Sequence, residues 1–330
     1  MINVGTPESP ERNAVRGFLR EFLSDPRVVD LPKIQRFLLL HLFILPFRPK
    51  RVAPKYRRIW MDRGSPLAVH SRKLAQETAR KLGNGYAVEA AMRYGRPSIE
   101  SGLKRLFSQK IDRLIAVPLM PQYASATTGT IVEKILVTMQ NRPYLPEIKI
   151  IGAFYDHPAY LKSMAEVGRR YWERKPDHVL FSFHGLPKRQ LAGDGGLNGS
   201  CLAEGECCDE ISDGNYTCYR AQCFAAARKL AQALEIPDRM YSVAFQSRLG
   251  RTEWIAPYTN ETIGELARNG IERLVVFCPS FVTDCLETLE EIGMEGESLF
   301  RRHGGKHLIL VPSLNAEPVW VDALTAMISE

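Results

Sequence analysis

The stretch Val179–Lys188 reads VLFSFHGLPK, and it decides how the chain around it folds. Its first five residues form a run with the length and the aromatic content expected of a buried strand,. Gly185 and Pro187 then force the chain to turn out of the sheet,. His184 therefore stands just past the carboxyl end of a predicted strand, where the side chains of an open α/β sheet meet a ligand.

Seven further strands are predicted on either side of this one, and they alternate with amphipathic stretches of helical period. This alternation is the βαβ pattern of a parallel sheet. The eight predicted strands are Ile2–Val4, Val88–Met92, Leu114–Val117, Ile148–Phe154, Val179–Phe183, Tyr241–Phe245, Leu274–Phe277 and Leu308–Val311.

Two segments of the chain repeat each other. Leu114–Tyr123 (LIAVPLMPQY) and Leu274–Asp284 (LVVFCPSFVTD) each run from a strand through a proline into a polar turn. Helices are predicted after them, near Ser125–Gln140 and Asp284–Ile292. The repeat predicts two similar halves, and 330 residues are enough for two α/β domains,. The cleft between the halves is the first candidate for a ligand site.

The composition and the charge narrow the classes of partner. Apolar residues make up 45% and charged residues 25% of the chain, as in a globular protein, and the net charge is +7,. That charge suits nucleic acid, an anionic membrane or an acidic small molecule, but no zinc-finger spacing or RNA-binding aromatic signature accompanies it. We therefore expect no nucleic-acid partner. The opening residues carry no secretory signal, which favours the cytoplasm,.

The most apolar stretch of the sequence is Ile34–Phe47 (IQRFLLLHLFILPF). With 14 residues, and with Arg36, His41 and Pro46 among them, it is too short to span a bilayer,. The residues by themselves favour a buried amphipathic helix. The alternative is a segment that touches a membrane, which would place the protein peripherally on the inner face of the cell membrane.

A row of carboxylates follows the second repeated segment. Phe281–Glu291 (FVTDCLETLEE) places Asp284, Glu287 and Glu291 at positions i, i+3 and i+7, on one face of a predicted helix,. Such a face is ordinarily solvated, but a row buried at the end of a strand would have raised pKa values and would relay protons. The imidazole of His184 is either a proton acceptor and ligand for Fe²⁺ or a cap for the carbonyls of its own loop.

An inserted loop rich in Gly, Asp, Glu and Cys is predicted between Ala192 and Asn215, and five cysteines lie close together in this part of the chain,. Disulfides are rare in the cytoplasm, so clustered thiols indicate zinc or an iron–sulfur cluster, with spectator thiols as the alternative. Cys-x-x-Cys pairs, typical of structural zinc, do not occur in the sequence,. Adjacent Cys207 and Cys208 can hardly both bind one iron. The preferred ligands are Cys201, Cys208, Cys218 and Cys223, with Cys207 as the substitute.

Taken together, these segments resemble the ferrochelatase family over almost the whole chain, from Asn3 to Asn315. The matching strings are Phe22–Pro26 (FLSDP), Tyr56–Leu67 (YRRIWMDRGSPL), Met92–Ser98 (MRYGRPS), Pro121–Gly129 (PQYASATTG), Phe183–Pro187 (FHGLP), Phe245–Thr259 (FQSRLGRTEWIAPYT) and Asp284–Ile292. So many separate matches in the same order make the resemblance far more specific than any single motif.

The resemblance implies an α/β fold of two similar Rossmann-like domains, with parallel sheets flanked by helices and a porphyrin cleft between them. The N-terminal domain is expected over residues 1–150, with an apolar lip at 34–47 that receives porphyrin beside a membrane. The C-terminal domain is expected over 151–315, with a cysteine-rich insertion at 192–223. A C-terminal helix is expected over 316–330.

The function implied by the resemblance is insertion of Fe²⁺ into protoporphyrin IX to form protohaem, the last step of haem biosynthesis, by a metal chelatase of the lyase class. His184 and Glu287 stand at the positions that bind metal and remove protons, and Asp284 and Glu291 match the acidic helix face. The residues expected to line the porphyrin are Arg93, Tyr94, Tyr123, Trp254 and Phe281. Arg93 would pair with the propionates.

The sequence departs from the family pattern at two places. Many relatives have a histidine where this chain has Cys285, so a second imidazole in the proton path is not expected. Animal relatives take most of their iron–sulfur ligands from a C-terminal extension, and the position of their upstream ligand is Ser125 here. A [2Fe-2S] cluster in this protein would therefore take all its ligands from the insertion, as in some prokaryotic relatives.

Two other functions are left open by the sequence. One is another tetrapyrrole chelatase, such as a cobalt enzyme with a similar histidine and glutamate pair. The other is an iron–sulfur redox or iron-sensing protein, in which the cysteines would be the functional centre. The sequence does not decide the oligomeric state, and a homodimer is compatible with it.

Overall fold

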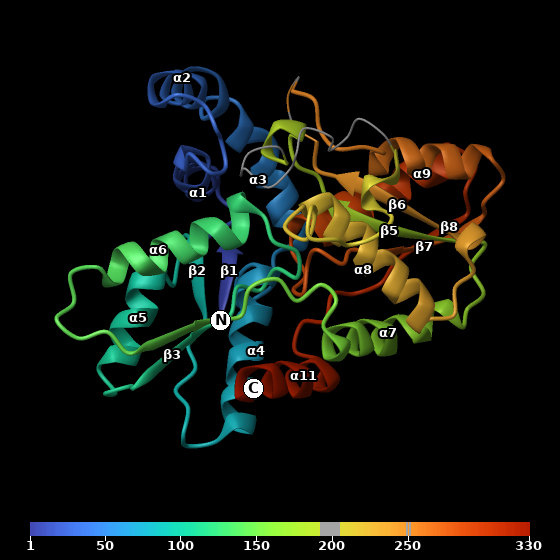
Figure 1. The fold of residues 1–330 in the computed structure, drawn as a ribbon. Coiled ribbons are helices and arrows are strands. Elements are labelled where there is room, and N and C mark those ends of the chain that lie inside the picture. The colour runs from blue at the N-terminus through green and yellow to red at the C-terminus, as the bar shows by residue number, and fades with distance from the viewer. Residues whose placement is uncertain (192–204, 249, 251) are drawn as a thin grey trace. The chain divides into compact units, whose positions relative to one another are not determined.

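The computed structural model describes residues 1–191, 205–248, 250 and 252–330 (Figure 1). The chain divides into two compact units, and each contains parallel strands and helices. The first unit consists of Met1–Met120, Ala124–Gly152 and Asn315–Glu330. The second consists of Pro121–Tyr123 and Ala153–Leu314. The C-terminal segment therefore returns to the unit in which the chain begins.

The first unit contains two pairs of parallel strands. They are β1 (Ile2–Gly5) with β2 (Ala91–Tyr94), and β3 (Arg113–Ala116) with β4 (Glu147–Ile150). The residues after β3 join the pairs, since the Ile2 amide donates to the Val117 carbonyl and the Leu119 amide donates back to Ile2, both at 2.8 Å. All strands of this unit thus run in the same direction, as the βαβ pattern predicts.

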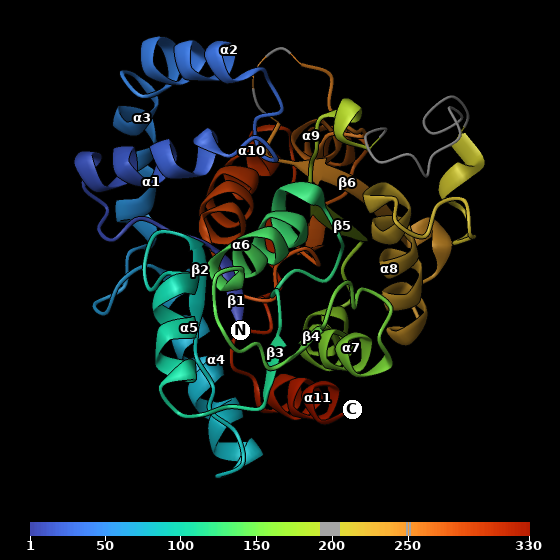
Figure 2. The same ribbon diagram turned by 60° about the vertical axis from the view of Figure 1, so that its left-hand side comes forward.

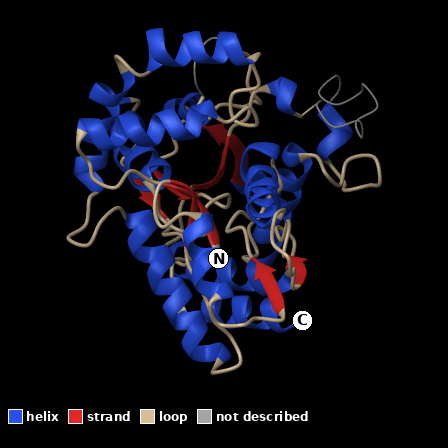
Figure 3. Ribbon diagram, turned by 90° about the vertical axis from the view of Figure 1, so that its left-hand side faces the viewer, coloured by secondary structure: helices blue, strands red, loops and turns tan. Residues whose placement is uncertain are grey.

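Helices surround these strands (Figures 2 and 3). α5 and α6 bury their apolar stripes against β1, β2 and β3 in a core that includes Ile2, Leu103, Leu114 and Ile131. On α4 and α5 the residues Ser65 and Ser98 act as N-caps, because their hydroxyls accept amides of the first turn,. The helices are α1 (Arg12–Ser24), α2 (Lys33–Leu38), η1 (Leu39–Ile44), α3 (Arg48–Ile59), α4 (Pro66–Leu82), α5 (Ile99–Phe107), η2 (Ser125–Gly129), α6 (Thr130–Met139) and α11 (Pro318–Ser329).

The second unit contains one parallel sheet of four strands in the order β6-β5-β7-β8. Its strands are β5 (His178–His184), β6 (Tyr241–Gln246), β7 (Arg273–Phe277) and β8 (His307–Leu310). Its helices are α7 (Pro158–Trp172), η3 (Lys188–Gln190), η4 (Gly205–Cys208), α8 (Tyr219–Ala233), η5 (Asp238–Met240), α9 (Thr259–Arg268), η6 (Glu287–Gly296) and α10 (Glu297–Arg302). β5 is the predicted strand that carries His184.

Side chains of this sheet alternate between two apolar faces. Leu180 and its neighbours pack against α9, η6 and α10. Phe245 points to the other face, where its ring centroid lies 6.1 Å from that of Phe224 in α8. Gly168 of α7 lies against the Phe277 ring so closely that a β-carbon there would overlap it. Helices on both faces explain why all but one residue in each of β5 and β7 is buried,.

The structure confirms the predicted strands and corrects three other expectations. Each predicted strand overlaps an observed one, although β4 ends at Ile150 because its partner β3 ends at Ala116. A buried helix over 34–47 is wrong, since most of the large apolar side chains of α2 and η1 are exposed, although Leu40 is buried. The insertion ends before 223, because α8 begins at Tyr219 and contains Cys223. The carboxylates of 284–291 do not share an α-helix, because a π-helix begins at Glu287.

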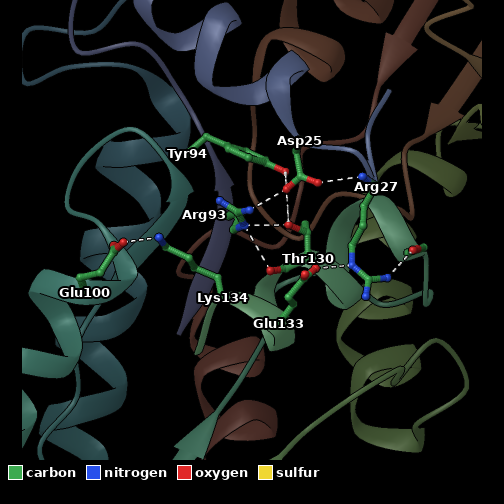
Figure 4. A network of polar contacts seen from close by, with 9 residues as sticks. Asp25, Arg27, Arg93, Tyr94, Glu100, Thr130, Glu133 and Lys134 are labelled. Atoms are coloured by element: carbon green, nitrogen blue, oxygen red, sulfur yellow. Dashed lines mark hydrogen bonds and ion pairs between the residues drawn. The ribbon is translucent and has the colours of Figure 1, made fainter. Parts of the chain in front are cut away.

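A buried ion pair joins three elements of the first unit (Figure 4). Asp25, just after α1, accepts hydrogen bonds through its Oδ2 from Arg93 (2.6 Å) and Tyr94 (2.8 Å) of β2. The Thr130 hydroxyl, at the start of α6, donates to the same oxygen at 2.6 Å. The Asp25 carboxylate is only 5% exposed. This network therefore fixes α1, β2 and α6 to one another.

The electrostatics of this network keep Asp25 ionised. Burial by itself would raise the pKa of Asp25,. Hydrogen bonds from Thr130, the Arg27 amide and Tyr94, together with the charge of Arg93, outweigh burial and hold the pKa below its ordinary value. Sequence reasoning missed Asp25, because nothing in the string FLSDP shows that a distant arginine pairs with it.

Replacing Asp25 by Ala should lower the free energy of unfolding by about 3–5 kcal/mol, because the buried Arg93 guanidinium loses its counter-ion. Urea unfolding at pH 7 measures this loss. Glu147→Ala is the matched control, since it removes an exposed partner of Arg113 and should cost less than about 1 kcal/mol,. Equal costs for the two variants would contradict the role of Asp25.

The pH dependence of stability gives a second check on the same carboxylate. Because the pKa of Asp25 is lowered in the folded protein, its stabilisation is present above its ordinary pKa of about 4 and is lost as the pH falls through the folded value,. Asp25→Ala should therefore weaken the acid-side decline in the free energy of unfolding.

Candidate active site

His184 is the last residue of β5, and it pairs in register with Gln246 at the end of β6. Its main-chain amide donates to the Ser280 hydroxyl at 3.3 Å, and its ring lies edge-on to Phe281 with centroids 6.1 Å apart. Ser280 and Phe281 follow the end of β7. The carboxyl ends of three adjacent strands therefore supply the surroundings of this imidazole, as predicted for an open parallel sheet.

The orientation of the His184 ring decides which nitrogen is available. Nδ1 lies 2.6 Å from the carbonyl oxygen of Gly185. A carbonyl can only accept, so Nδ1 carries the hydrogen, and in the neutral ring Nε2 keeps its lone pair. That lone pair can accept a proton or bind a metal. The predicted alternative is a histidine that caps the carbonyls of its own loop. Nδ1 does this, but Nε2 does not take part in that contact and is the nitrogen that could react.

Glu287 and Glu291 lie on η6, the π-helix that follows β7. The Glu287 carbonyl accepts from the Gln246 side chain at 2.9 Å, which ties the helix to β6 beside His184. Because a π-helix bonds residues five apart, its wider turn brings side chains four to five apart onto one face. Glu291 interacts electrostatically with both Glu287 and His184, so these three side chains belong to one site.

The environment of Glu291 favours its protonated form. Burial raises its pKa and the neighbouring charge of Glu287 adds to the rise, although two hydrogen bonds from Ser247 oppose it,. The Ser247 amide donates to one oxygen at 2.7 Å and its hydroxyl to the other at 2.6 Å. Ser247 reaches both oxygens from a left-handed backbone with φ of 67°. Such strain in a residue other than glycine is typical of functional sites.

Asp284 has a different position from the two glutamates. It is buried, and its Oδ1 accepts from the Ser313 amide and the Thr288 hydroxyl, both at 3.1 Å. These contacts fasten the start of the helix. Cys285, at the position where many relatives have histidine, is buried, and burial raises its pKa, as does the adjacent Glu287. Its thiol is therefore neutral.

The predicted porphyrin residues fall into two groups. Phe281 lies on the His184 ring, and Trp254 lies against Gly185, where a β-carbon would be 3.2 Å from its ring. Tyr123 also belongs to the second unit, and its amide donates to the Gln222 side chain at 2.8 Å. Arg93 and Tyr94 belong to the first unit, where Asp25 holds their polar groups and Tyr94 is buried.

The described cysteines of the predicted cluster gather at the start of α8. Cys208 and Cys218 form a buried apolar group with Ala221, and Cys223 is fully buried nearby. Arg220 donates to the Cys208 sulfur at 3.0 Å, and the sulfur of Cys207 is 3.8 Å from that of Cys208. Cys201 lies outside the described residues. Among the residues that are described, no three His, Cys, Asp or Glu side chains are arranged to hold a metal ion.

The stretch 34–47 presents an apolar surface. Five large side chains of α2, η1 and the turn after them are more than half exposed: Ile34, Phe37, Leu42, Phe43 and Phe47. We call these five residues the apolar lip. Lys50 and Arg51 of the adjoining α3 are exposed as well. None of the helices described is both long enough and apolar enough to cross a membrane.

Three comparisons place the chain among known proteins. The ferrochelatase family profile matches residues 1–330. A ferrochelatase of Coxiella burnetii (strain Dugway 5J108-111) is 47% identical over 328 residues, which are 99% of this chain and 91% of the relative. A ferrochelatase of Legionella pneumophila (strain Lens) is 43% identical over 330 residues, 100% and 98% of the two chains. The structure of SirB from Bacillus subtilis with Fe³⁺ superposes with a TM-score of 0.52 at 16% identity, over 81% of this chain and 91% of that one, and shares the fold.

Proposed function

Since the chain belongs to the ferrochelatase family and inserts ferrous iron into protoporphyrin to make haem, we propose that His184, Glu287 and Glu291 are the residues that carry out the insertion. The observation that carries this proposal is the free Nε2 of His184 beside a glutamate whose burial favours the protonated form. We assign the reaction to the lyases, because it forms iron–nitrogen bonds without hydrolysis or a change of oxidation state. The matches to ferrochelatases do not favour a cobalt chelatase or an iron sensor.

Metal insertion releases two protons from the porphyrin for each Fe²⁺ that is bound. A free porphyrin carries two N–H protons at its centre, and Fe²⁺ takes their place while the four nitrogens become its ligands. In our proposal Nε2 of His184 accepts a pyrrole proton, and Glu287 and Glu291 pass protons along the face of η6. The shifted pKa of Glu291 suits this task, because a carboxyl group that titrates nearer neutral pH can both take and release a proton,.

We also propose which side chains hold the macrocycle. Phe281 and Trp254 present aromatic rings beside His184, and Tyr123 joins them from the same unit. Arg93 and Tyr94 would then help to hold the macrocycle from the first unit, where hydrogen bonds to Asp25 fix their positions. The cleft between the two domains stays a prediction.

Replacing His184 by Ala should reduce iron insertion by at least about 100-fold, because loss of a positioned proton acceptor costs that much or more. Porphyrin binding should be unchanged. An anaerobic assay with Fe²⁺ and protoporphyrin measures the rate, and porphyrin fluorescence measures binding. His307→Ala, an exposed histidine at the start of β8, is the control. Undiminished turnover in His184→Ala would remove this residue from the mechanism.

We propose further that the cysteines hold a [2Fe-2S] cluster that orders the segment before α8. Cys208 and Cys218 fit this assignment because they are buried together, and Cys223 is buried close to them. Arg220 donates to the Cys208 sulfur, as groups around iron–sulfur clusters do,. The fourth ligand would be Cys201, with Cys207 as the substitute. The cluster supplies cross-links between chain segments when it is bound.

Purified protein should contain iron and sulfide in equal amounts and absorb visible light. Cys218→Ser should remove that absorption, whereas Cys278→Ser, which changes a buried thiol in the core of the second unit, should keep it. Iron and sulfide analysis of both variants, made anaerobically, is the measurement. A colourless wild-type protein that contains zinc would contradict the cluster, whatever its activity.

We propose last that the apolar lip touches an anionic membrane surface, as a peripheral contact on the inner face of the cell membrane. Large apolar side chains that are exposed close together on a protein surface typically mark an interaction site, and the five residues of the lip are such a group,. The exposed basic residues of α3 complement acidic lipid head groups,. Whether the protein forms a homodimer stays a prediction.

Replacing Phe37, Leu42 and Phe43 together by Ser should lower binding to vesicles of phosphatidylglycerol and phosphatidylcholine at least about tenfold, since each buried side chain contributes about 1.5–3 kcal/mol. Vesicle sedimentation measures this. Tyr144→Ser is the control, because Tyr144 is equally exposed in the first unit but lies outside the lip. Unchanged binding of the triple variant would refute the contact.

A further inference from the structure

The hydroxyl of Tyr219 reaches the main chain of His184. Tyr219 is the first residue of α8, and its OH donates to the His184 carbonyl oxygen at 2.8 Å. The same hydroxyl lies 3.0 Å from the Ser280 hydroxyl, which accepts the His184 amide at 3.3 Å. The peptide groups on both sides of His184 are therefore held by a single pair of hydroxyl groups.

This pair of hydroxyl groups is well shielded from water. Tyr219 is 7% and Ser280 is 9% exposed. Hydrogen bonds between buried neutral groups fix geometry because no water competes for them. They set the direction in which the His184 side chain leaves the end of β5.

Tyr219 also follows directly on the cysteine-bearing segment. Cys218 is the N-cap of α8, and its amide donates to the Asn215 carbonyl at 2.8 Å. The Asn215 side chain in turn donates to the carbonyls of Cys207 and Glu210, both at 2.8 Å. Hydrogen bonds therefore connect Cys207 through Asn215 to Cys218, the chain leads from Cys218 to Tyr219, and the Tyr219 hydroxyl reaches His184.

From these contacts we infer that Tyr219 is a positioning residue for His184, through which the order of the segment from Cys207 to Cys218 controls the rate of iron insertion. The inference rests on the proposed role of His184. It does not require the cysteines to bind a cluster. Anything that loosens the segment shifts the first turn of α8, and the His184 main chain then loses its donor. Misplacement of a reacting group by about 1 Å can cost about 100-fold in rate.

The test begins with Tyr219→Phe in the full-length protein, which removes the hydroxyl and keeps the ring. We expect kcat for Fe²⁺ insertion to fall about tenfold, with the KM for protoporphyrin unchanged, since the aromatic groups that hold the macrocycle are untouched. Tyr160→Phe is the matched control. It also removes a buried phenol that donates to a carbonyl at 2.8 Å, but to that of Pro279 rather than that of His184.

Equal losses of kcat in Tyr219→Phe and Tyr160→Phe would overturn the inference, because a general loosening of the fold would then explain both. Wild-type kcat in Tyr219→Phe would overturn it as well. If Tyr219→Phe does not fold, Ser280→Ala removes the other hydroxyl, and it should give the same split between kcat and KM.

The link to the cysteine-bearing segment is tested with Asn215→Ala. This variant should lower kcat in the wild-type background but have no further effect in the Tyr219→Phe background, because both changes break the same connection. Additive losses would overturn the link. His184→Ala, assayed alongside, distinguishes a failure of the proposed function from a failure of the positioning role. Full activity there refutes the proposed function, whereas loss there with normal Tyr219→Phe refutes only the positioning role.

Discussion

The parallel pairing of β5 with β6 on one side and β7 on the other is the constraint on which the site depends. The register places His184 opposite Gln246. The residues that follow β7 bring the Ser280 hydroxyl to the His184 amide, which donates to it. Gln246 then holds the Glu287 carbonyl, which brings the start of η6 to the same edge of the sheet. A shift of one residue in β5 would turn the imidazole to the opposite face of the sheet and separate it from the glutamates.

Much of this arrangement could be predicted from the sequence. The apolar run before His184 predicts its strand, and the Gly and Pro after it predict the turn,. The π-helix could not be predicted, because its hydrogen bonds shift by only one residue from those of an α-helix and leave no pattern in the sequence. The spacing i, i+3, i+7 groups Asp284 with the glutamates, and the folded chain adds that its carboxylate accepts hydrogen bonds from the Thr288 hydroxyl and the Ser313 amide. Its part in the reaction stays a prediction.

Contacts between distant segments were the other part that sequence reasoning missed. The string MRYGRPS identifies Arg93 and Tyr94 as family residues, but only the folded chain shows that Asp25 occupies their polar groups. The same holds for Tyr219, which no motif includes. For the stretch 34–47 the apolar pattern was clear, yet hydrophobicity alone cannot distinguish a face buried in the protein from an apolar face that is exposed,.

Two carboxylates of this protein, Asp25 and Glu291, show why burial alone does not define a role. Asp25 accepts hydrogen bonds from Thr130 and Tyr94 and faces the charge of Arg93, so its pKa is lowered and it stays an anion that holds the fold. Burial raises the pKa of Glu291 and the charge of Glu287 adds to the rise, although Ser247 donates two hydrogen bonds that lower it,. A group that is always ionised cannot carry protons at neutral pH, whereas one whose charged and neutral forms are closer in energy can. This contrast supports the proposal that proton removal takes place beside His184, whereas Asp25 belongs to the framework.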